Sequence, residues 1–313
     1  MASLATAMRF EEMLDSEPAA KPSPMITVED GKSEPAAAPR TPPLIVLRTG
    51  TDRLPIFMTH GLGGTVSELQ DLATHINSEN PIFGIQARGL DGLDEPHRSI
   101  EDMAMFALDA IKQVQRRGPY LLVGYSLGGL VMLEAAQRLS SNAEDVLLLA
   151  MLETYPHRRF LSLAQRARIS GRLVRSHVSQ AMRLPLRGAV SYIAHRAKRK
   201  LLISSEGHDR VSFPPPPGTS LPPQMQQVRD SAYLAWTRYR PYYYRGKIAF
   251  VRAEVSSEFP DDPAAVWGGL AQELQVETVP GDHSGILTTH FKSLASTLSR
   301  YLREAIERKC RSY

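Results

Sequence analysis

The sequence predicts an α/β fold in which a mostly parallel sheet is covered by helices on both faces. From Leu44 onward, short apolar segments alternate with longer segments whose apolar residues recur at helical spacing. Such alternation is typical of parallel sheets. Residues Val146 to Leu152 are continuously apolar, as expected of a strand buried on both faces. The 313 residues, 42% of them hydrophobic, are enough for one large core.

The expected elements follow one another regularly along the chain. Strands are expected at residues 44–47, 55–59, 81–85, 120–125, 146–152, 247–252 and 274–279. Helices are expected at residues 66–76, 99–117, 127–139 and 291–308. Ser99 is the expected N-cap of the second helix, because two acidic residues follow it in the first turn.

Two stretches depart from this alternation. Residues 1–43 contain seven prolines and are predicted to form a disordered tail or linker, since they bury too little apolar surface to offset their ordering entropy. The domain is predicted at residues 44–313. Within it, residues from about 154 to 245 hold short helical pieces and proline runs. An insertion of this length is usually functional, and it is predicted to be a helical lid.

Composition excludes several classes of function. No apolar run approaches the roughly 20 residues of a membrane helix, and the first residues do not resemble a signal peptide. The lone Cys310 rules out an internal disulfide and suits a reducing compartment, so a cytoplasmic protein is expected. No spacing typical of metal ligands occurs, and no cofactor is predicted.

The segment Gly124-Tyr-Ser-Leu-Gly128 carries the strongest chemical signal. It follows an expected strand and opens an expected helix, which is the context of a strained turn that exposes a nucleophilic serine. The two glycines allow strand and helix to pack closely around Ser126. The free N–H of Leu127 would lie at the positive end of the helix and could stabilise an oxyanion.

The general base and the acid are sought just after later strands, in the order serine, acid, histidine. Of nine histidines, His283 is preferred because it lies in the turn after the strand at 274–279. His60 precedes the serine, and His290 begins the last helix. Glu153 is preferred as the acid because it ends the strand at 146–152. The alternatives are Glu254, Glu258, Asp261, Asp262 and Asp282.

The glycine-rich loop His60-Gly-Leu-Gly-Gly64 is expected to supply the second oxyanion donor. Leu62 is the preferred residue and Gly61 the alternative. The loop lacks the Lys-Ser/Thr ending of a phosphate-binding P-loop, which argues against nucleotide binding. Residues expected to line the acyl pocket, or else to belong to the lid core, are Tyr125, Met182, Tyr192, Tyr233, Trp236 and Tyr239.

Several segments together resemble the thioesterase domains of fatty acid, polyketide and nonribosomal peptide synthases, which have the α/β-hydrolase fold. They are His60-Gly-Leu-Gly-Gly64, the segments at 82–92, 99–104 and 118–129, Glu153-Thr-Tyr-Pro156, Tyr239-Arg-Pro-Tyr242 and Pro280-Gly-Asp-His283. The resemblance covers about residues 44–302. It implies an aspartate in most members where this chain has Glu153, and glutamate can also act as the acid in this fold.

The resemblance implies a serine thioesterase. It would cleave an acyl thioester of coenzyme A or of a carrier protein's phosphopantetheine arm through an acyl-serine. A transacylase or macrocyclase would pass the same acyl group to another nucleophile, and a carboxylesterase would act on simple esters. The alternative of another class is a catalytically inactive binding module on this fold.

The predicted lid is strongly basic at its start. Residues 157–201 contain 12 Lys or Arg residues and no Asp or Glu. This composition is typical of an amphipathic helix with a solvated charged face, and it would also attract an acidic carrier protein or the phosphates of coenzyme A. Nucleic acid is not expected as a partner, because few aromatic residues accompany the basic ones.

Overall fold

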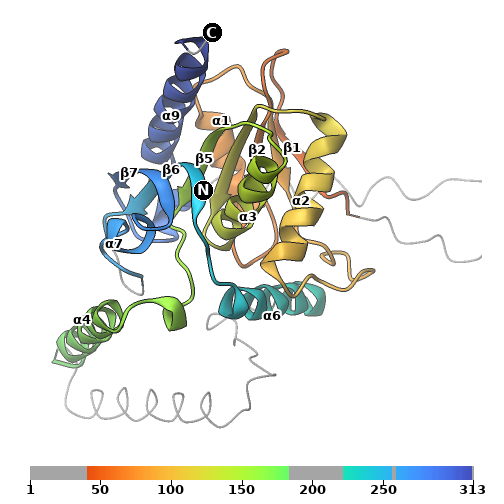
Figure 1. Cartoon of the computed structure of the whole chain (residues 1–313). Coiled ribbons are helices and arrows are strands. Elements are labelled where there is room, and N and C mark those ends of the chain that lie inside the picture. Colours follow the sequence, from red (N-terminus) through yellow and green to blue (C-terminus); the bar gives the residue numbers. More distant parts are fainter. Residues whose placement is uncertain (1–40, 183–220, 256–258, 312–313) are drawn as a thin grey trace, which may run out of the picture. The chain divides into compact units, whose positions relative to one another are not determined.

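A computed structural model describes residues 41–182, 221–255 and 259–311, and a seven-stranded sheet forms its centre (Figure 1). The strand order is β1-β3-β2-β4-β5-β6-β7. The strands are β1 (Leu44–Arg48), β2 (Ile56–Thr59), β3 (Ile82–Ile85), β4 (Tyr120–Tyr125), β5 (Val146–Leu152), β6 (Tyr244–Ala253) and β7 (Ala271–Val279). Only the pair β1 and β3 is antiparallel among the described strands. The predicted mostly parallel sheet is therefore confirmed.

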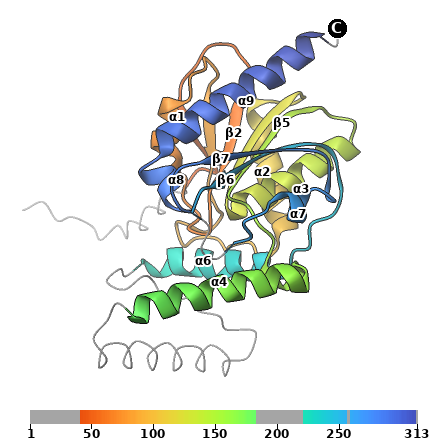
Figure 2. The same cartoon turned by 90° about the vertical axis from the view of Figure 1, so that its left-hand side faces the viewer.

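Helices cover both faces of the sheet (Figures 1 and 2). One face is covered by α1 (Gln70–His75) and α9 (Phe291–Arg311), and the other by α2 (Ile100–Val114) and α3 (Leu127–Ser141). Strand β4 serves both sides: Leu121 and Val123 lie in the core beside α9, whereas Leu122 lies in the core beside α3. This alternation follows from the two-residue period of a strand. It explains why β4 is apolar throughout.

Several short elements were not predicted from periodicity. The expected helix at 66–76 is divided into a 3₁₀ turn, η1 (Ser67–Leu69), and α1. Three further pieces are η2 (Arg158–Phe160), α7 (Ala264–Trp267) and α8 (Gly285–Thr288). Single turns hold too few residues to show a period of 3.6. Strands β6 and β7 each begin three residues before the predicted start, where Arg245 and Gln272 are exposed and polar.

The predicted N-cap of α2 is present, and two helices follow β5 in the region from about 154 to 245. The Ser99 hydroxyl accepts a hydrogen bond from the Asp102 N–H at 3.1 Å and so caps α2. After β5, the chain forms α4 (Leu163–Met182) and later α6 (Pro223–Arg238), which lie beyond one end of the sheet in both views (Figures 1 and 2). Residues 1–40 of the predicted tail and 183–220 of the predicted lid lie outside the described residues.

Candidate active site

The turn between β4 and α3 holds Ser126 in a strained conformation. Its φ is 53° and its ψ is −117°, a region that non-glycine residues rarely adopt. The Ser126 N–H donates to the Leu152 carbonyl of the neighbouring strand at 2.8 Å, which fixes the turn to β5. The sheet and α3 together hold the strained residue in place, so its hydroxyl projects from the end of the sheet.

The glycines flanking Ser126 are required by close backbone approach. A Cβ on Gly124 would lie 2.4 Å from the Gly128 carbonyl oxygen. A Cβ on Gly128 would lie 2.4 Å from the His60 carbonyl oxygen, in the loop after β2. Real Cβ atoms do not approach backbone atoms so closely. The two glycines therefore bring the nucleophile turn, α3 and the loop at residues 60–64 together.

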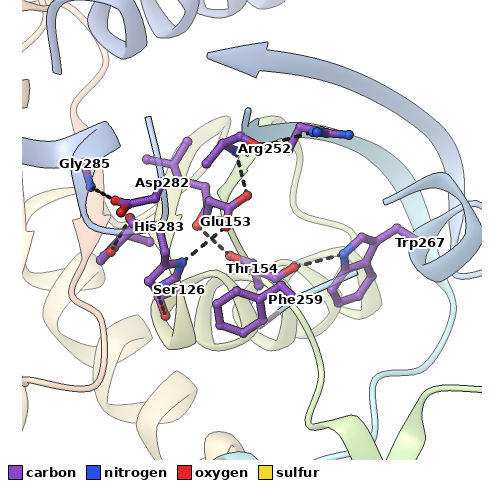
Figure 3. A network of polar contacts seen from close by, with 12 residues as sticks. Ser126, Glu153, Thr154, Arg252, Phe259, Trp267, Asp282, His283 and Gly285 are labelled. Carbon is purple, nitrogen blue, oxygen red and sulfur yellow. Dashed lines mark hydrogen bonds and ion pairs between the residues drawn. The ribbon is translucent and has the colours of Figure 1, made fainter. Parts of the chain in front are cut away.

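Ser126, His283 and Glu153 form a continuous polar chain (Figure 3). The Ser126 Oγ and His283 Nε2 atoms are 3.1 Å apart, and His283 Nδ1 and Glu153 Oε2 are 3.4 Å apart. With its proton on Nδ1, the imidazole donates to the carboxylate and accepts from the hydroxyl. The longer second contact is typical of catalytic hydrogen bonds before substrate binds.

Glu153 is fixed by the strands on which it lies. Glu153 is only 2% exposed, and its backbone φ is 47°. Its Oε1 atom accepts a hydrogen bond from the Ala253 N–H at 2.7 Å. The Ala253 amide belongs to β6, the neighbour of β5. One carboxylate oxygen is thus held by the sheet while the other faces His283, which orients the imidazole.

The other acids weighed from the sequence lie in different surroundings. Asp282 accepts from the Gly285 N–H at 2.7 Å, and Asp262 accepts from the Ala264 N–H at 3.0 Å at the start of α7. Asp261 pairs with Arg172, and Glu254 is exposed. Glu258 lies outside the described residues. Of the described acids, Glu153 is the one recorded in an ion-pair contact with His283.

Leu127 and Leu62, the two residues expected to supply oxyanion amides, both line the cavity beside Ser126. Leu127 is the first residue of α3, so its N–H has no acceptor within the helix. Leu62 lines the same cavity as Ser126. The alternative donor, the Gly61 N–H, instead donates to Glu68 Oε1 at 2.9 Å. His60, also weighed as a base, is buried with its Nδ1 atom 2.6 Å from the Gly61 carbonyl oxygen.

A cavity of about 650 Å³ opens beside Ser126 and His283. Trp236 lines it as predicted and donates its indole N–H to the Tyr155 carbonyl at 2.9 Å. Tyr233, which the sequence also suggested, lines it as well. The walls further include residues that the sequence did not single out for the pocket: Tyr155, Pro156, His157, Arg158, Leu161, Arg166, Ile169, Arg229, Phe259, Pro260 and Ser284.

Two expected pocket residues, Tyr239 and Tyr125, have other surroundings. Tyr239 is 3% exposed and donates its hydroxyl to Glu134 Oε2 at 3.0 Å, so it lies in the core rather than at the cavity. Tyr125 contacts His283 instead: its hydroxyl donates to the His283 carbonyl at 2.8 Å. The side chain of Met182, and the whole of Tyr192, lie outside the described residues. A sequence does not show which face of an aromatic helix reaches a cavity, because core and pocket faces are both apolar.

Phe259 and His157 are two further wall residues with defined contacts. The Phe259 ring centroid lies 4.8 Å from that of His283, and the ring stacks on Tyr155 at 5.2 Å. Burial, with the nearby charges of Arg159 and Arg158, lowers the pKa of His157 to about 4. His157 is therefore neutral near pH 7. The sequence offered one indication that His157 lines the cavity: it directly follows the segment 153–156, which begins with the predicted acid.

Two features are absent from the described residues. No group of His, Cys, Asp and Glu side chains there has the arrangement of a metal site. Among the described helices, none has the length and apolar character to cross a membrane.

A family model, curated relatives and solved structures are similar to parts of this chain. The family model of the thioesterase domain matches residues 54–187. A dimodular nonribosomal peptide synthase of Bacillus subtilis (strain 168) is 41% identical over 114 residues, which is 36% of this chain and 5% of the synthase. The chain thus spans a small part of the curated relatives it matches.

Two solved structures show the same architecture. The four-domain nonribosomal peptide synthetase holo-AB3403 has a TM-score of 0.59 at 22% identity, covering 82% of this chain and 20% of that one. The RedJ thioesterase of Streptomyces coelicolor has a TM-score of 0.53 at 20% identity, covering 86% and 97%. The resemblance to thioesterase domains and the α/β-hydrolase fold expected from the sequence are confirmed.

Proposed function

Because residues 54–187 match the thioesterase-domain family, we propose that this chain is a serine hydrolase that cleaves an acyl thioester. The observation that carries the proposal is the polar chain from Ser126 through His283 to Glu153, at the open end of the sheet and beside a cavity. This arrangement of nucleophile, base and orienting acid is what acyl transfer through a covalent serine ester requires.

In the first half of the reaction, Ser126 Oγ attacks the thioester carbonyl carbon while His283 Nε2 takes the hydroxyl proton. The Glu153 carboxylate stabilises the resulting imidazolium. The carbonyl oxygen becomes an oxyanion that accepts hydrogen bonds from the Leu127 and Leu62 amides. When the intermediate collapses, the carbon–sulfur bond breaks, the thiolate takes the proton from His283, and an acyl ester of Ser126 remains.

In the second half, His283 takes a proton from a water molecule as that water attacks the ester carbonyl. The oxyanion again faces the two amides, and Ser126 Oγ leaves with the proton from His283. The products are a carboxylic acid and the free enzyme. A substrate hydroxyl or amine in place of water would give a macrocycle or a transfer product by the same steps. A simple ester in place of the thioester would make the chain a carboxylesterase.

The proposed substrate is an acyl group on the phosphopantetheine arm of a carrier protein, or on coenzyme A. The similarity to a nonribosomal peptide synthase supports a carrier-bound substrate. Arg158 and Arg166 line the cavity and are exposed, so they can meet a phosphate at its entrance. In this proposal, the stretch at about 154–245, with α4 and α6, acts as the lid, and the basic residues of 157–201 form the docking surface.

Two assays test the function in sequence. A fluorophosphonate probe should label the wild-type chain at Ser126 and should not label the Ser126→Ala variant. Absence of labelling in the wild type would support the inactive binding module instead. Carrier-bound acyl substrates should then release the free acid, identified by mass spectrometry. A cyclic product would identify a macrocyclase instead, and a transferred acyl group would identify a transacylase. Activity restricted to simple esters would identify a carboxylesterase.

A further inference from the structure

A second carboxylate, that of Glu68, lies near enough to His283 for their charges to interact. Glu68 belongs to η1 and accepts the Gly61 N–H through its Oε1 atom at 2.9 Å. Gly61 is the residue directly before Leu62, the proposed oxyanion donor. The Glu68 carboxylate therefore fixes the backbone next to the proposed donor, and the Gly61 N–H is already engaged in this bond.

Tyr125 connects this loop to the histidine. Its ring stacks on the His283 ring at 5.1 Å between centroids with 28° between planes, and its hydroxyl donates to the His283 carbonyl at 2.8 Å. The position of a Cβ on Gly61 is 3.2 Å from two carbon atoms of the Tyr125 ring and 3.4 Å from Glu68 Oε1. The oxyanion loop and the histidine loop thus rest on one aromatic side chain of β4.

The surrounding charges indicate that Glu68 acts on His283. The residue Glu68 is exposed, yet partial burial of its carboxylate raises its pKa above the usual range, while the Gly61 amide and the charge of His283 lower it. Burial raises the pKa of Tyr125 as well, and the charge of Glu68 raises it further. The Glu68 carboxylate thus interacts with both Tyr125 and His283.

From these contacts, we propose that Glu68 and Tyr125 are positioning residues. They hold the proposed oxyanion amide of Leu62 and the imidazole of His283 in fixed positions relative to each other. Glu68 sets the Gly61–Leu62 backbone and adds a second negative charge beside the imidazolium. Tyr125 carries both loops on β4. This inference rests on the proposed serine hydrolase function, because the relative positions of the amide and the imidazole affect the rate only if Ser126 is acylated.

Other charged groups around His283 limit what can be attributed to Glu68. Glu153 faces Nδ1 from the end of β5, and Tyr125 faces the ring from β4. Asp282, next in the same loop, is bonded to the Gly285 amide. Arg158, Arg166 and Arg229 line the shared cavity. A variant that changes Glu68 alone leaves all of these charges in place.

The test compares Glu68→Ala with Glu68→Gln in the full chain. Glu68→Ala removes both the acceptor and the charge, and kcat should fall about tenfold with little change in KM, less than the loss of a whole oxyanion donor. Glu68→Gln retains an acceptor for the Gly61 N–H, so most of kcat should return. Asp71→Asn removes an exposed acidic charge three residues away and should change neither kcat nor KM.

Tyr125→Phe provides a second measurement because it retains the stacked ring and removes the hydroxyl, which bonds to the His283 carbonyl and to the Ser284 side chain. The rate of fluorophosphonate labelling of Ser126 should fall about fivefold, the factor that one neutral hydrogen bond contributes. The inference is overturned if Glu68→Ala and Tyr125→Phe both label at the wild-type rate, or if Glu68→Gln restores no more activity than Glu68→Ala. Labelling does not need a thioester, so a wild-type chain that is labelled but does not release acid would refute the proposed function alone.

Discussion

At the residue scale, Glu153 is the position where this chain differs from the aspartate that its resemblance implies. The longer side chain begins from a residue with φ of 47° and reaches both the Ala253 amide and His283. Glu153→Gln should keep the shape but remove the charge that stabilises the imidazolium, so kcat should fall by about 10²–10⁴. Steady-state kinetics on a thioester would measure the loss.

The matched control for this change is Glu254→Gln, since Glu254 was the main alternative acid and is exposed. It should retain wild-type kcat. The opposite pattern, with activity lost in Glu254→Gln and kept in Glu153→Gln, would identify Glu254, directly after β6, as the catalytic acid.

His157 gives a prediction about pH and stability. Burial lowers its pKa to about 4, below the ordinary value of 6.5, so the unfolded chain binds more protons between these values. The contribution of His157 to stability is therefore complete above pH 6.5 and is lost as the pH falls toward 4. His157→Gln should flatten the decline in the free energy of unfolding between pH 7 and pH 5, measured by urea titration. An unchanged decline would mean that His157 is protonated at no extra cost in the folded chain.

At the scale of elements, the β4–α3 unit depends on contact between two backbones. Gly124→Ala would place a methyl group 2.4 Å from the Gly128 carbonyl oxygen. The helix would have to shift, and the free energy of unfolding should fall by about 1–3 kcal/mol, with fluorophosphonate labelling slowed. Gly269→Ala adds the same methyl group where no atom lies within 4 Å, and it should leave both measurements unchanged. Equal effects in the two variants would contradict the packing explanation.

Helix α4 allows a sharper test of carrier docking. Arg172 already donates to the Phe259 carbonyl and pairs with Asp261 at 3.2 Å, so its role is structural. Arg166 and Arg168 are exposed on the same helix. The double variant Arg166→Glu, Arg168→Glu should lower kcat/KM for a carrier-bound substrate about tenfold at low salt. The loss should be smaller at high salt, because salt screens long-range attraction.

The control for this charge reversal lies at the opposite end of β4. Arg116 and Arg117 are exposed just before that strand, and their reversal changes the net charge equally. That variant should keep its kcat/KM. If both double variants lose activity alike, net charge rather than the α4 surface governs the encounter.

At the scale of the whole molecule, the beginning of the folded unit can be tested. The Thr41 N–H donates to Asp91 Oδ2 at 2.8 Å, and the Pro43 carbonyl accepts from the Gln86 N–H at 2.9 Å. Both contacts precede β1, the predicted start of the domain. A chain beginning at residue 41 should keep the melting temperature and labelling rate of the full chain, whereas one beginning at residue 44 should melt lower. Equal melting temperatures for the two would show that the contacts contribute nothing measurable.

The sequence by itself determined the order of the seven strands and of the main helices, the serine turn between β4 and α3, and the general positions of His283 and Glu153. These follow from local rules: apolar periodicity, glycines beside a serine, and polar residues at the ends of buried strands. For β1 to β5, the bounds predicted from the sequence agree with the observed strand bounds to within one residue at each end.

Only the tertiary structure decided which side chains meet. It placed Tyr239 against Glu134 in the core, Tyr125 against His283, and Glu68 on the Gly61 amide. Each of these contacts joins residues on different elements, and its partners are set by how those elements pack. An aromatic ring or a carboxylate has the same local pattern in a core, at a surface or beside a histidine, so no periodicity distinguishes them.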